Sequence, residues 1–595
     1  MSEQQRVTRR SFLHWASATG AATAAGSILV ACGGSKSAPN PGTSAPTSAP
    51  TSAPTTAAIN PTRVATTGAA TTTSGTAGTT AATTASGTAT TGGTTAAAAI
   101  SGLPTPITTR IPAPAGKRDL ILAQGADITT LDPQLSTTGN DDNATFNLYD
   151  NLTFRDLDYS LKPMLATEWK TTGDKQWTFK LRQGVKFHNG DPFTAADVKF
   201  TIERTYDPNA KTLVSTIFTT VDTIQTPDDA TVVFNTKGPD PLLPARLANY
   251  GGQMMPAKYF QQVGAAGFGA KPVGTGPIKF IEQVKDDHTT FDANKDYWGG
   301  VPGYDRVIFR PRPETAARIA SLLSGESDII ANVPPDQTDQ INKGGKTRTE
   351  GAIFDGLYVL AVNSKVPPLT NKFVKQALSY ATDRASLLKE IWRSHGIIPN
   401  GAISNGDFAY DPSIPPLPYD PNKAKDLLKQ ANYNNEEIII ETTQGYLPND
   451  RQMAEAIAQM WKAAGINAKV ELIEISVRAQ KNTAKSFKGL WWSDPGSTTQ
   501  DPDGMLWRLL GPGGPQDYWR DPEFDKLGAE ARVSLDPNLR QKDYRRMDEI
   551  FRENLPWVPI IQPYTSWGVA NYVNFKLYGT LNLNLRKEIT TFVTS

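Results

Sequence analysis

The chain has 595 residues, one cysteine and a formal net charge of +1, with 20% charged and 38% hydrophobic residues. One cysteine excludes a disulfide framework and a cysteine-based zinc site, and the composition is typical of a globular body and not of a membrane bundle. Residues 1–31 carry +2 and residues 32–116 carry +3, which leaves −4 for residues 117–595. An acidic body argues against nucleic-acid binding, which needs clustered Lys and Arg.

Residues 1–31 have the layout of an export signal. Residues 8–13, Thr-Arg-Arg-Ser-Phe-Leu, form a twin-arginine pattern, although His14 stands where that motif usually has lysine. An uncharged segment rich in Ala, Gly and Thr follows and ends in Leu-Val-Ala before Cys32. This segment resembles a bacterial lipoprotein signal with Cys32 as the lipidated first residue. The alternative is an uncut transmembrane anchor, which the short and weakly hydrophobic segment disfavours.

Residues 32–116 are predicted to be a disordered tether. They are nearly all Thr, Ala, Ser, Gly and Pro, with Thr-Ser-Ala-Pro repeats between residues 43 and 54. Such a segment buries too little to offset its chain entropy, and as a flexible coil it would span roughly 50 Å. Segments of this composition can also be O-glycosylated stalks. No later segment has 18 consecutive apolar residues, so we do not expect the body to span a membrane.

The first clear elements of the body are a strand and a helix. Trp177, Phe179 and Leu181 alternate with polar residues, which predicts a half-buried strand between two turn dipeptides. The run from Thr194 to Asp197 resembles a capping box and predicts a helix that starts there.

Three further helices are predicted from apolar stripes at helical spacing. Gly325 and Gly465 stand where glycine ends a helix, and Asp420 followed by proline is a helix start. An extended run at 468–475 follows the third helix. This alternation favours an α/β body with sheets flanked by helices. The three stripes are Ala316, Ile319, Ala320 and Leu323; Ala424, Leu427, Leu428 and Ala431; and Met453, Ile457, Met460, Trp461 and Ala464.

Catalytic and metal-binding motifs are almost absent. The four histidines are far apart in the sequence, and no zinc-protease motif, EF-hand loop or nucleophile elbow occurs. His188 lies beside an Asn-Gly turn, where a structural or solvated role is expected. The run at 345–347 resembles the end of a phosphate loop, but Gln340 occupies the position of its first glycine. We therefore expect no catalytic residues, no metal and no cofactor, although missing motifs do not exclude an enzyme.

A series of short motifs runs through the body in order. The longest is Leu-Arg-Gln-Gly-Val-Lys-Phe-His-Asn-Gly at 181–190, which leads into Phe-Thr-Ala-Ala-Asp-Val at 193–198. Together the motifs resemble the family 5 extracellular solute-binding proteins, the oligopeptide, dipeptide and nickel receptors of ABC importers. The resemblance covers nearly all of 117–595. The other matching runs are 273–277, 294–298, 324–328, 374–378 with 383–384, 419–424 and 461–466.

The resemblance implies an α/β fold of the periplasmic-binding-protein type, class II. Two lobes built from three discontinuous segments would close over a ligand cleft, and strands that cross near 356 and 566 would act as the hinge. Lobe 2 would take 357–565. Lobe 1 would take 117–150, 277–356 and 566–595, with an intermediate subdomain at 151–276.

The resemblance also implies a ligand site. In peptide-binding relatives an Asp after a tryptophan-bearing strand pairs with the α-ammonium of the ligand, and Asp494 matches it; the alternative is that Asp494 only forms a turn. Trp491 and Trp492 would face opposite sides of that strand, and the resemblance favours Trp491 as the one that lines the cleft. Thr137 and Gly139 match an early loop that contacts ligand in relatives.

One departure from the family pattern bears on the ligand. Dipeptide receptors hold the ligand carboxylate with an arginine, and Gln444 occupies the matching position here, with Arg451 nearby. A glutamine makes only neutral hydrogen bonds, so a longer peptide or a neutral ligand is favoured over a free dipeptide. Nickel is disfavoured because no ligand set is evident.

The resulting prediction is a monomeric, extracytoplasmic substrate-binding lipoprotein of an ABC importer. Cys32 would anchor it to the outer face of the plasma membrane or to the periplasmic side of an envelope. It would capture an oligopeptide by lobe closure and deliver it to membrane permease and ATPase subunits, without binding nucleic acid. The alternatives are a receptor of the same fold for an oligosaccharide or another small organic solute and, less favoured, a cell-surface hydrolase or an envelope sensor.

Overall fold

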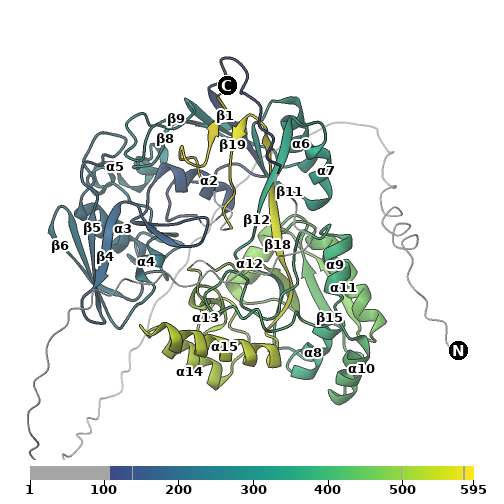
Figure 1. Cartoon of the computed structure of the whole chain (residues 1–595). Helices are drawn as coiled ribbons and strands as arrows, with labels where there is room; N and C mark the ends of the chain where they lie inside the picture. Colours follow the sequence, from purple (N-terminus) through teal and green to yellow (C-terminus); the bar gives the residue numbers. More distant parts are fainter. Residues whose placement is uncertain (1–106, 137, 498, 580–582, 595) are drawn as a thin grey trace, which may run out of the picture. The chain divides into compact units, whose positions relative to one another are not determined.

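The computed structural model describes residues 107–136, 138–497, 499–579 and 583–594 (Figure 1). All of them belong to one compact unit, Thr94–Ser595. The predicted signal, Cys32, most of the predicted tether and Thr137 lie outside the described residues. None of the helices in the described part of the chain combines the length and the apolar character needed to cross a membrane.

A mixed twelve-stranded sheet runs through the molecule in the order β16-β15-β17-β13-β18-β11-β1-β10-β9-β8, with β12 and β14 also paired to β18. Strand β1 is parallel to β10, and β15 is parallel to β16 and β17, whereas β18 is antiparallel to its partners. The bounds are β1 Asp119–Gln124, β8 Ile278–Val284, β9 His288–Ala293, β10 Arg306–Pro311, β11 Ile329–Val333, β12 Thr347–Ile353, β13 Tyr358–Val362, β14 Gly396–Ile397, β15 Ile438–Thr442, β16 Ala468–Leu472, β17 Leu490–Ser493 and β18 Trp557–Ala570.

Strand β18 joins two lobes. Its first half pairs with β13, where Val558 lies opposite Leu360, and its second half pairs with β11 and β12, where Gly568 lies opposite Ile330. The chain crosses a second time between β12 and β13, at residues 354–357. The fold is thus the expected α/β, two-lobed one (Figure 1). Below, "lobe 1" denotes the part of the chain that contains β1 and β8–β12, and "lobe 2" denotes the part that contains β13–β17.

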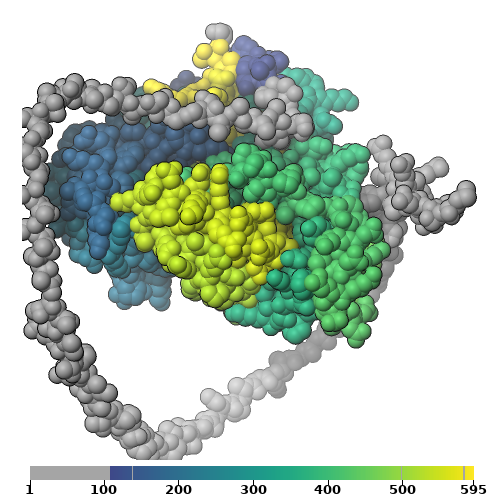
Figure 2. All heavy atoms as spheres, turned by 60° about the horizontal axis from the view of Figure 1, so that its bottom comes forward, coloured from purple at the N-terminus to yellow at the C-terminus, as the bar shows by residue number. Residues whose placement is uncertain are grey.

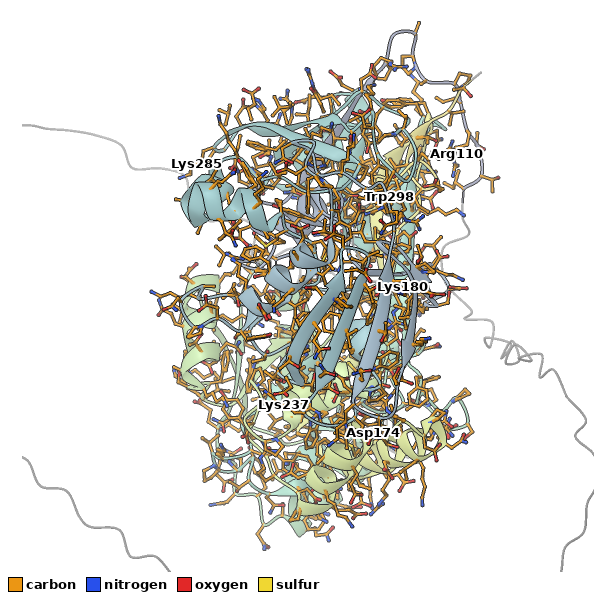
Figure 3. All side chains as sticks on the ribbon, turned by 90° about the vertical axis from the view of Figure 1, so that its left-hand side faces the viewer. Arg110, Asp174, Lys180, Lys237, Lys285 and Trp298 are labelled. Atoms are coloured by element: carbon orange, nitrogen blue, oxygen red, sulfur yellow. The ribbon has the colours of Figure 1, made fainter. Side chains whose placement is uncertain are left out.

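A separate four-stranded antiparallel sheet, β4-β5-β7-β6, lies within residues 151–276, which are called the intermediate subdomain below. In Figure 3 this sheet faces the viewer. The predicted strand is β5, and Phe179 and Leu181 are buried as expected. The predicted helix is α3, where the Asp197 carboxylate accepts a 2.8 Å hydrogen bond from the backbone N–H of Thr194. The bounds in this region are β2 Thr153–Arg155, β3 Leu161–Pro163, β4 Ala166–Thr171, β5 Gln176–Leu181, α3 Ala195–Thr205, β6 Val221–Asp228, β7 Thr231–Thr236, α4 Leu243–Arg246 and α5 Ala257–Ala270.

Helix α2 (Gly139–Leu148) is held against the loop that carries Gly274 and Gly276. A Cβ at Gly274 would lie 2.0 Å from the carbonyl oxygen of Leu148, and one at Gly276 would lie 2.1 Å from that of Asn147. Only glycine fits this approach of two backbones. His188 packs here too: its Nε2 lies 3.0 Å from the Gly276 carbonyl oxygen, and burial lowers its pKa to about 4. Its role is therefore structural, as expected.

The helices of lobe 2 cover both faces of its part of the sheet. Helices α8, α10 and α11 pack with Leu360 and Trp492 on one face, whereas α13, α14 and α15 pack with Val359 and Trp491 on the other. The remaining bounds are α6 Thr315–Ser324, α7 Thr338–Asn342, α8 Lys372–Tyr380, α9 Arg384–Glu390, α10 Pro421–Gln430, α11 Asp450–Ala463, α12 Ile475–Ala484, α13 Leu506–Leu510, α14 Pro522–Ala531, α15 Pro537–Asn554, β19 Val573–Asn574 and β20 Thr591–Phe592.

The helix predictions hold with two corrections. In α6 the predicted stripe is only partly right: Ile319 is buried as predicted, but Ala316, Ala320 and Leu323 are exposed and Leu322 is buried instead. Gly325 ends the helix with φ of 82°, as predicted. The extended run predicted at 468–475 is shorter, because β16 ends at Leu472 and α12 begins at Ile475. The stripes of α10 and α11 are buried as predicted, except that Met460 and Ala431 are only half-buried.

Candidate functional site

Asp494 lies at the end of β17, where lobe 2 faces lobe 1. Its carboxylate accepts a hydrogen bond from the hydroxyl of Tyr446, which precedes α11. Burial raises the pKa of Asp494, while the Tyr446 hydrogen bond and the positive charges of Arg478 and Arg508 oppose that rise. The side chain is nonetheless half-exposed. A carboxylate that reaches water while surrounded by protein is typical of a binding cleft.

Arg478 on α12 holds Tyr446 in place. Its guanidinium carbon lies 3.4 Å from the centre of the Tyr446 ring, and its Nη2 donates a 3.1 Å hydrogen bond to the carbonyl oxygen of Trp492. The stacking and the hydrogen bond together fix the guanidinium beside the ring. The Tyr446 hydroxyl is therefore aimed at Asp494 by a neighbour that is itself anchored to β17.

Lobe 1 presents Tyr250 and two side chains of α2 to the same region. The Tyr250 hydroxyl donates a 2.8 Å hydrogen bond to Asp142, and its ring meets Phe146 edge-on with centroids 5.7 Å apart. Burial raises the pKa of Asp142 to about 8, and burial together with the charges of Asp142 and Asp494 raises that of Tyr250. The charges of Asp494 and Arg508, which belong to lobe 2, also shift the pKa of Tyr250, which belongs to lobe 1. The cluster therefore includes residues of both lobes.

The lobes touch beside this cluster through two arginines of the intermediate subdomain. In Figure 2 the yellow-green part of lobe 2 lies in front of the blue atoms of the subdomain. The Arg155 Nη2 donates a 2.6 Å hydrogen bond to the carbonyl oxygen of Thr499, and Arg246 pairs with Asp503 at 3.1 Å. Both arginines belong to the subdomain, and both acceptors belong to lobe 2. These contacts hold the described conformation closed.

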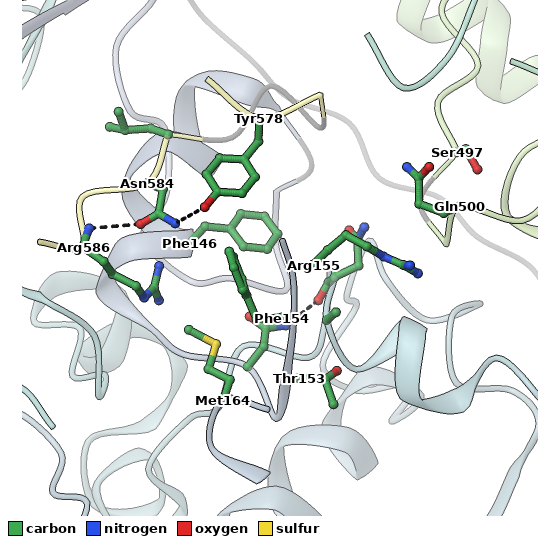
Figure 4. Close-up of a pocket in the computed structure, with 14 residues that line it drawn as sticks. Phe146, Thr153, Phe154, Arg155, Met164, Ser497, Gln500, Tyr578, Asn584 and Arg586 are labelled. Atoms are coloured by element: carbon green, nitrogen blue, oxygen red, sulfur yellow. Dashed lines mark hydrogen bonds between the residues drawn. The ribbon is translucent and has the colours of Figure 1, made fainter. Parts of the chain in front are cut away.

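A small cavity remains between the lobes (Figure 4). Its volume is about 50 Å³, which has room for a few water molecules and is well below the roughly 300–1,000 Å³ of pockets that hold organic ligands. Gln500 of lobe 2 is buried at its wall, and neither polar atom of its amide has a hydrogen-bond partner among the described residues. Other wall residues are Phe146, Arg155, Ser497, Tyr578 and Arg586.

The two predicted tryptophans lie on opposite faces of β17, as the strand pattern predicts, but both are core residues. Trp491 is 1% exposed and stacks on Phe487 with ring centroids 4.2 Å apart. Trp492 is also 1% exposed, and its Nε1 donates a 2.9 Å hydrogen bond to the carbonyl oxygen of Asp450. The expectation that one of them, preferably Trp491, lines the cleft is therefore not met in this conformation, because helices cover both faces of the strand.

Of the other predicted ligand residues, Gln444 and Gly139 lie at the surface. Gln444 is exposed, and its Oε1 lies 3.5 Å from Nη1 of Arg451, which pairs with Glu455. Gly139 is the exposed first residue of α2, and Thr137 lies outside the described residues. Asp494 is thus the one predicted side chain that the described structure places within the interlobe cluster.

Sequence reasoning missed Asp142, Tyr250, Tyr446 and Arg508. Tyr446 is two residues from Gln444 and Arg508 is 14 residues after Asp494, whereas Asp142 and Tyr250 belong to segments far from Asp494 in the sequence. No motif marks them, and only the fold brings them together. No group of three or more His, Cys, Asp or Glu side chains in the described ranges could hold a metal ion.

Comparisons with known proteins agree with the fold. The model of the bacterial extracellular solute-binding proteins, family 5 (middle), matches residues 160–517. Di/tripeptide-binding protein 1 of Pseudomonas aeruginosa is 30% identical over 478 residues, which cover 74% of this chain and 88% of that protein. The glutathione-binding protein of Escherichia coli K12 is 25% identical over 456 residues, which cover 75% of this chain and 89% of that protein.

Solved structures of similar proteins have the same fold. The ABC transporter-associated periplasmic binding protein of Helicobacter pylori, in complex with the peptide STSA, matches with a TM-score of 0.71 and 26% identity over 80% of this chain and 98% of that chain. The dipeptide-binding protein of a Pseudoalteromonas species, in complex with Met-Leu, matches with a TM-score of 0.72 and 26% identity over 80% and 100%. With its matching motifs, two-lobed sheet and interlobe carboxylate, the chain belongs to family 5 of the bacterial extracellular solute-binding proteins.

Proposed function

We propose that this chain is the substrate-binding component of an ABC importer and that it captures a peptide between its lobes and releases it unaltered to a membrane permease. One observation carries the proposal. Asp494 is a half-buried carboxylate at the lobe boundary that forms no ion pair with any described residue. A buried carboxylate needs a countercharge or hydrogen bonds, and the α-ammonium of a peptide supplies the countercharge.

The relatives support this ligand class. The two curated relatives described above are named for binding di- and tripeptides and glutathione, and the two solved structures described above hold a tetrapeptide and a dipeptide. The exposed Gln444 cannot form the charge-assisted fork that an arginine gives a carboxylate. A peptide longer than a free dipeptide is therefore the preferred ligand within the proposal.

Ligand entry requires the lobes to separate. A cavity of about 50 Å³ is too small for any peptide. Only two connections join the lobes in the described chain, the segment 354–357 and strand β18, and a few residues in each can absorb a hinge rotation. An open form would admit the peptide, and closure would then bring Tyr250 of lobe 1 over Asp494.

The proposal also includes a lipid anchor at Cys32. Cys32 at the expected cleavage point and the Thr/Ala/Ser/Pro-rich segment after it suit a monomeric receptor tethered by lipid outside the cytoplasm after twin-arginine export. Replacement of Cys32 by serine should move the protein from the membrane fraction to the soluble extracytoplasmic fraction. Membrane retention of the Cys32→Ser variant would instead indicate an uncut anchor.

Small-angle scattering tests the binding proposal. The full chain is measured alone and with a mixture of synthetic di- to octapeptides, and the fit treats the N-terminal segment as a separate component. The proposal predicts a smaller radius of gyration for the body with peptides, together with peptides of unchanged mass in the supernatant. A body whose radius never changes, or peptides that are cut, would argue against it.

A further inference from the structure

The side-chain amide of Gln500 is buried at the wall of the interlobe cavity without a partner. The residue is 7% exposed, and neither Nε2 nor Oε1 forms a hydrogen bond with any described residue. Figure 4 shows Gln500 beside Ser497, on the lobe 2 side of the cavity. Buried polar groups in native proteins are nearly always hydrogen-bonded, so an amide left bare at a cavity indicates that a bound group completes it.

The other polar side chains of this wall already have partners inside the protein. The Ser497 Oγ donates a 2.8 Å hydrogen bond to Asp407, and the Arg586 Nη2 donates one of 2.6 Å to Asp150. Gln500 is therefore the polar wall residue whose side chain has no partner in the described structure. The remaining wall residues that form such bonds are Asn151, Thr153, Arg155, Asn249, Tyr578 and Asn584.

The cavity admits one short side chain and not a length of peptide. Its volume of about 50 Å³ holds only a few non-hydrogen atoms. Phe154, Met164 and Leu583 form an apolar part of the wall, which suits the methylene group that links a small polar group to a peptide backbone. The side chain of asparagine, one methylene and one planar amide, has this size and composition.

A carboxamide satisfies both polar atoms of Gln500 at once. Nε2 needs an acceptor and Oε1 needs a donor, and a second carboxamide offers both in one plane. A carboxylate offers acceptors only and leaves Oε1 bare. The guanidinium of Arg155 at the same wall does not reverse this preference, because the negative charges of three buried acids act on it, those of Asp355, Asp407 and Asp501.

We propose that the cavity binds the side-chain carboxamide of an asparagine residue in the bound peptide and that Gln500 recognises it through a pair of hydrogen bonds. The inference deepens the proposed function and rests on it. Gln500 and Asp494 belong to the same connection, between β17 and the short helix η2 (Pro502–Gly504), so both lie where lobe 2 meets lobe 1. Asp494 would hold the ammonium group common to all peptides, and Gln500 would select among their side chains.

The test compares peptides that differ in one side chain of nearly constant shape. The full chain is incubated with equimolar alanine-based tri- to hexapeptides that carry one guest residue, Asn, Asp, Leu or Gln, at each position in turn, and captured peptides are counted by mass spectrometry. The variants are Gln500→Met and Gln500→Asn. The control is Gln183→Met, because Gln183 is exposed on the subdomain and bonds only to the nearby Leu181 carbonyl.

At one peptide position, the wild type and the control should capture Asn at least about ten-fold better than Asp or Leu, because a site that hydrogen-bonds a polar group rejects analogues that lack it. Gln500→Met should lose this preference and still capture the Leu peptides, which shows that it is folded. Gln500→Asn withdraws the amide by one methylene, so its preference should move from Asn to Gln.

Four results would overturn the role of Gln500 and leave the proposed function intact. They are equal capture of all guests by the wild type, which would mean that only water fills the cavity, a preference for Asp over Asn, a preference for Asn that survives in Gln500→Met, and an unchanged preference in Gln500→Asn. No capture of any peptide by the wild type would overturn the proposed function and this inference with it.

Discussion

The Tyr446 hydroxyl donates a hydrogen bond to the Asp494 carboxylate at the boundary between the two lobes. Tyr446 comes from the segment before α11 and Asp494 from the end of β17, so the contact joins two connections of lobe 2. The hydrogen bond favours the ionised carboxylate, whereas burial opposes ionisation. The pair therefore keeps a negative charge available for a cationic ligand group.

Replacement of Asp494 by asparagine should weaken the binding of peptides with a free N-terminus. The amide keeps the size of the side chain and removes the charge that pairs with the ammonium. We expect a loss of about 2–5 kcal/mol of binding free energy, measured by calorimetry with the tightest peptide of the library.

The matched control for Asp494→Asn is Asp296→Asn. The Asp296 carboxylate is 89% exposed on lobe 1, and its contact with Lys279 is long, at 3.9 Å. The control should bind like the wild type. Wild-type affinity in Asp494→Asn, or equal wild-type binding of N-acetylated and free peptides, would contradict an ammonium-binding role.

Replacement of Tyr446 by phenylalanine should shift the pH dependence of binding. The hydrogen bond from Tyr446 lowers the pKa of Asp494, so its loss lets the pKa rise further. Ammonium binding needs ionised Asp494, and affinity therefore increases as the pH rises through this pKa. In Tyr446→Phe the midpoint of that increase should move to higher pH. Titrations at several pH values between about 5 and 8 that give the same midpoint for both proteins would refute the assignment.

The buried carboxyl group of Asp355 should make the stability of the protein depend on pH. It is 4% exposed, both carboxylate oxygens lack hydrogen-bond partners among the described residues, and it lies in the crossing segment 354–357. Burial raises the pKa of Asp355 well above its usual value, the charge of Asp407 adds to this, and Arg155 opposes it. In the pH window above the unfolded-state pKa, the folded state holds this proton and the unfolded state has lost it.

The free energy of unfolding of the wild type should therefore fall as the pH rises from about 4 toward the raised pKa of Asp355, by up to about 1.4 kcal/mol per pH unit from this group. Asp355→Asn removes this contribution, so the variant should gain stability relative to the wild type, and gain more at pH 8 than at pH 5. Urea unfolding at both pH values measures the difference. An equal effect at both pH values would show that Asp355 titrates normally.

Replacement of Arg155 by methionine should favour the open form. The Arg155 guanidinium bridges the carbonyl oxygen of Tyr159 in the subdomain and that of Thr499 in lobe 2. The loss of a charge-assisted hydrogen bond between lobes costs about 1.5–3 kcal/mol, enough to shift the open–closed equilibrium about ten-fold or more. The ligand-free variant should show a larger radius of gyration by small-angle scattering and a weaker affinity for peptide.

Arg182→Met is the control for Arg155→Met. Arg182 lies over Trp298 and donates to the Met164 carbonyl, and both partners belong to lobe 1. Its loss should affect stability without changing the radius of the folded, ligand-free body. If both variants have the same radius, the bond from Arg155 does not hold the lobes together.

The features that can be predicted from the sequence are those that depend on neighbouring residues. The capping box at Thr194 and the proline start after Asp420 depend on a few neighbouring residues, and both were predictable. The buried face of α6 was not, because adjacent Leu322 and Leu323 each fit a helical stripe and only packing against β11 and β18 selects Leu322.

The site follows the same rule. Alternation along β17 predicts that Trp491 and Trp492 face opposite sides, but it contains no information on the helices that cover both sides. Asp494 could be found because a local motif accompanies it. Asp142 and Tyr250 could not, because they belong to lobe 1 and approach Asp494 only where the lobes meet, which no spacing in the sequence predicts.

Native mass spectrometry of the full chain with a defined peptide mixture tests the central claim most directly. The account predicts complexes with one peptide per chain and, after release, the recovery of each bound peptide at its original mass. Shortened peptides on release, or a chain that binds no member of a mixture covering two to eight residues, would contradict the account.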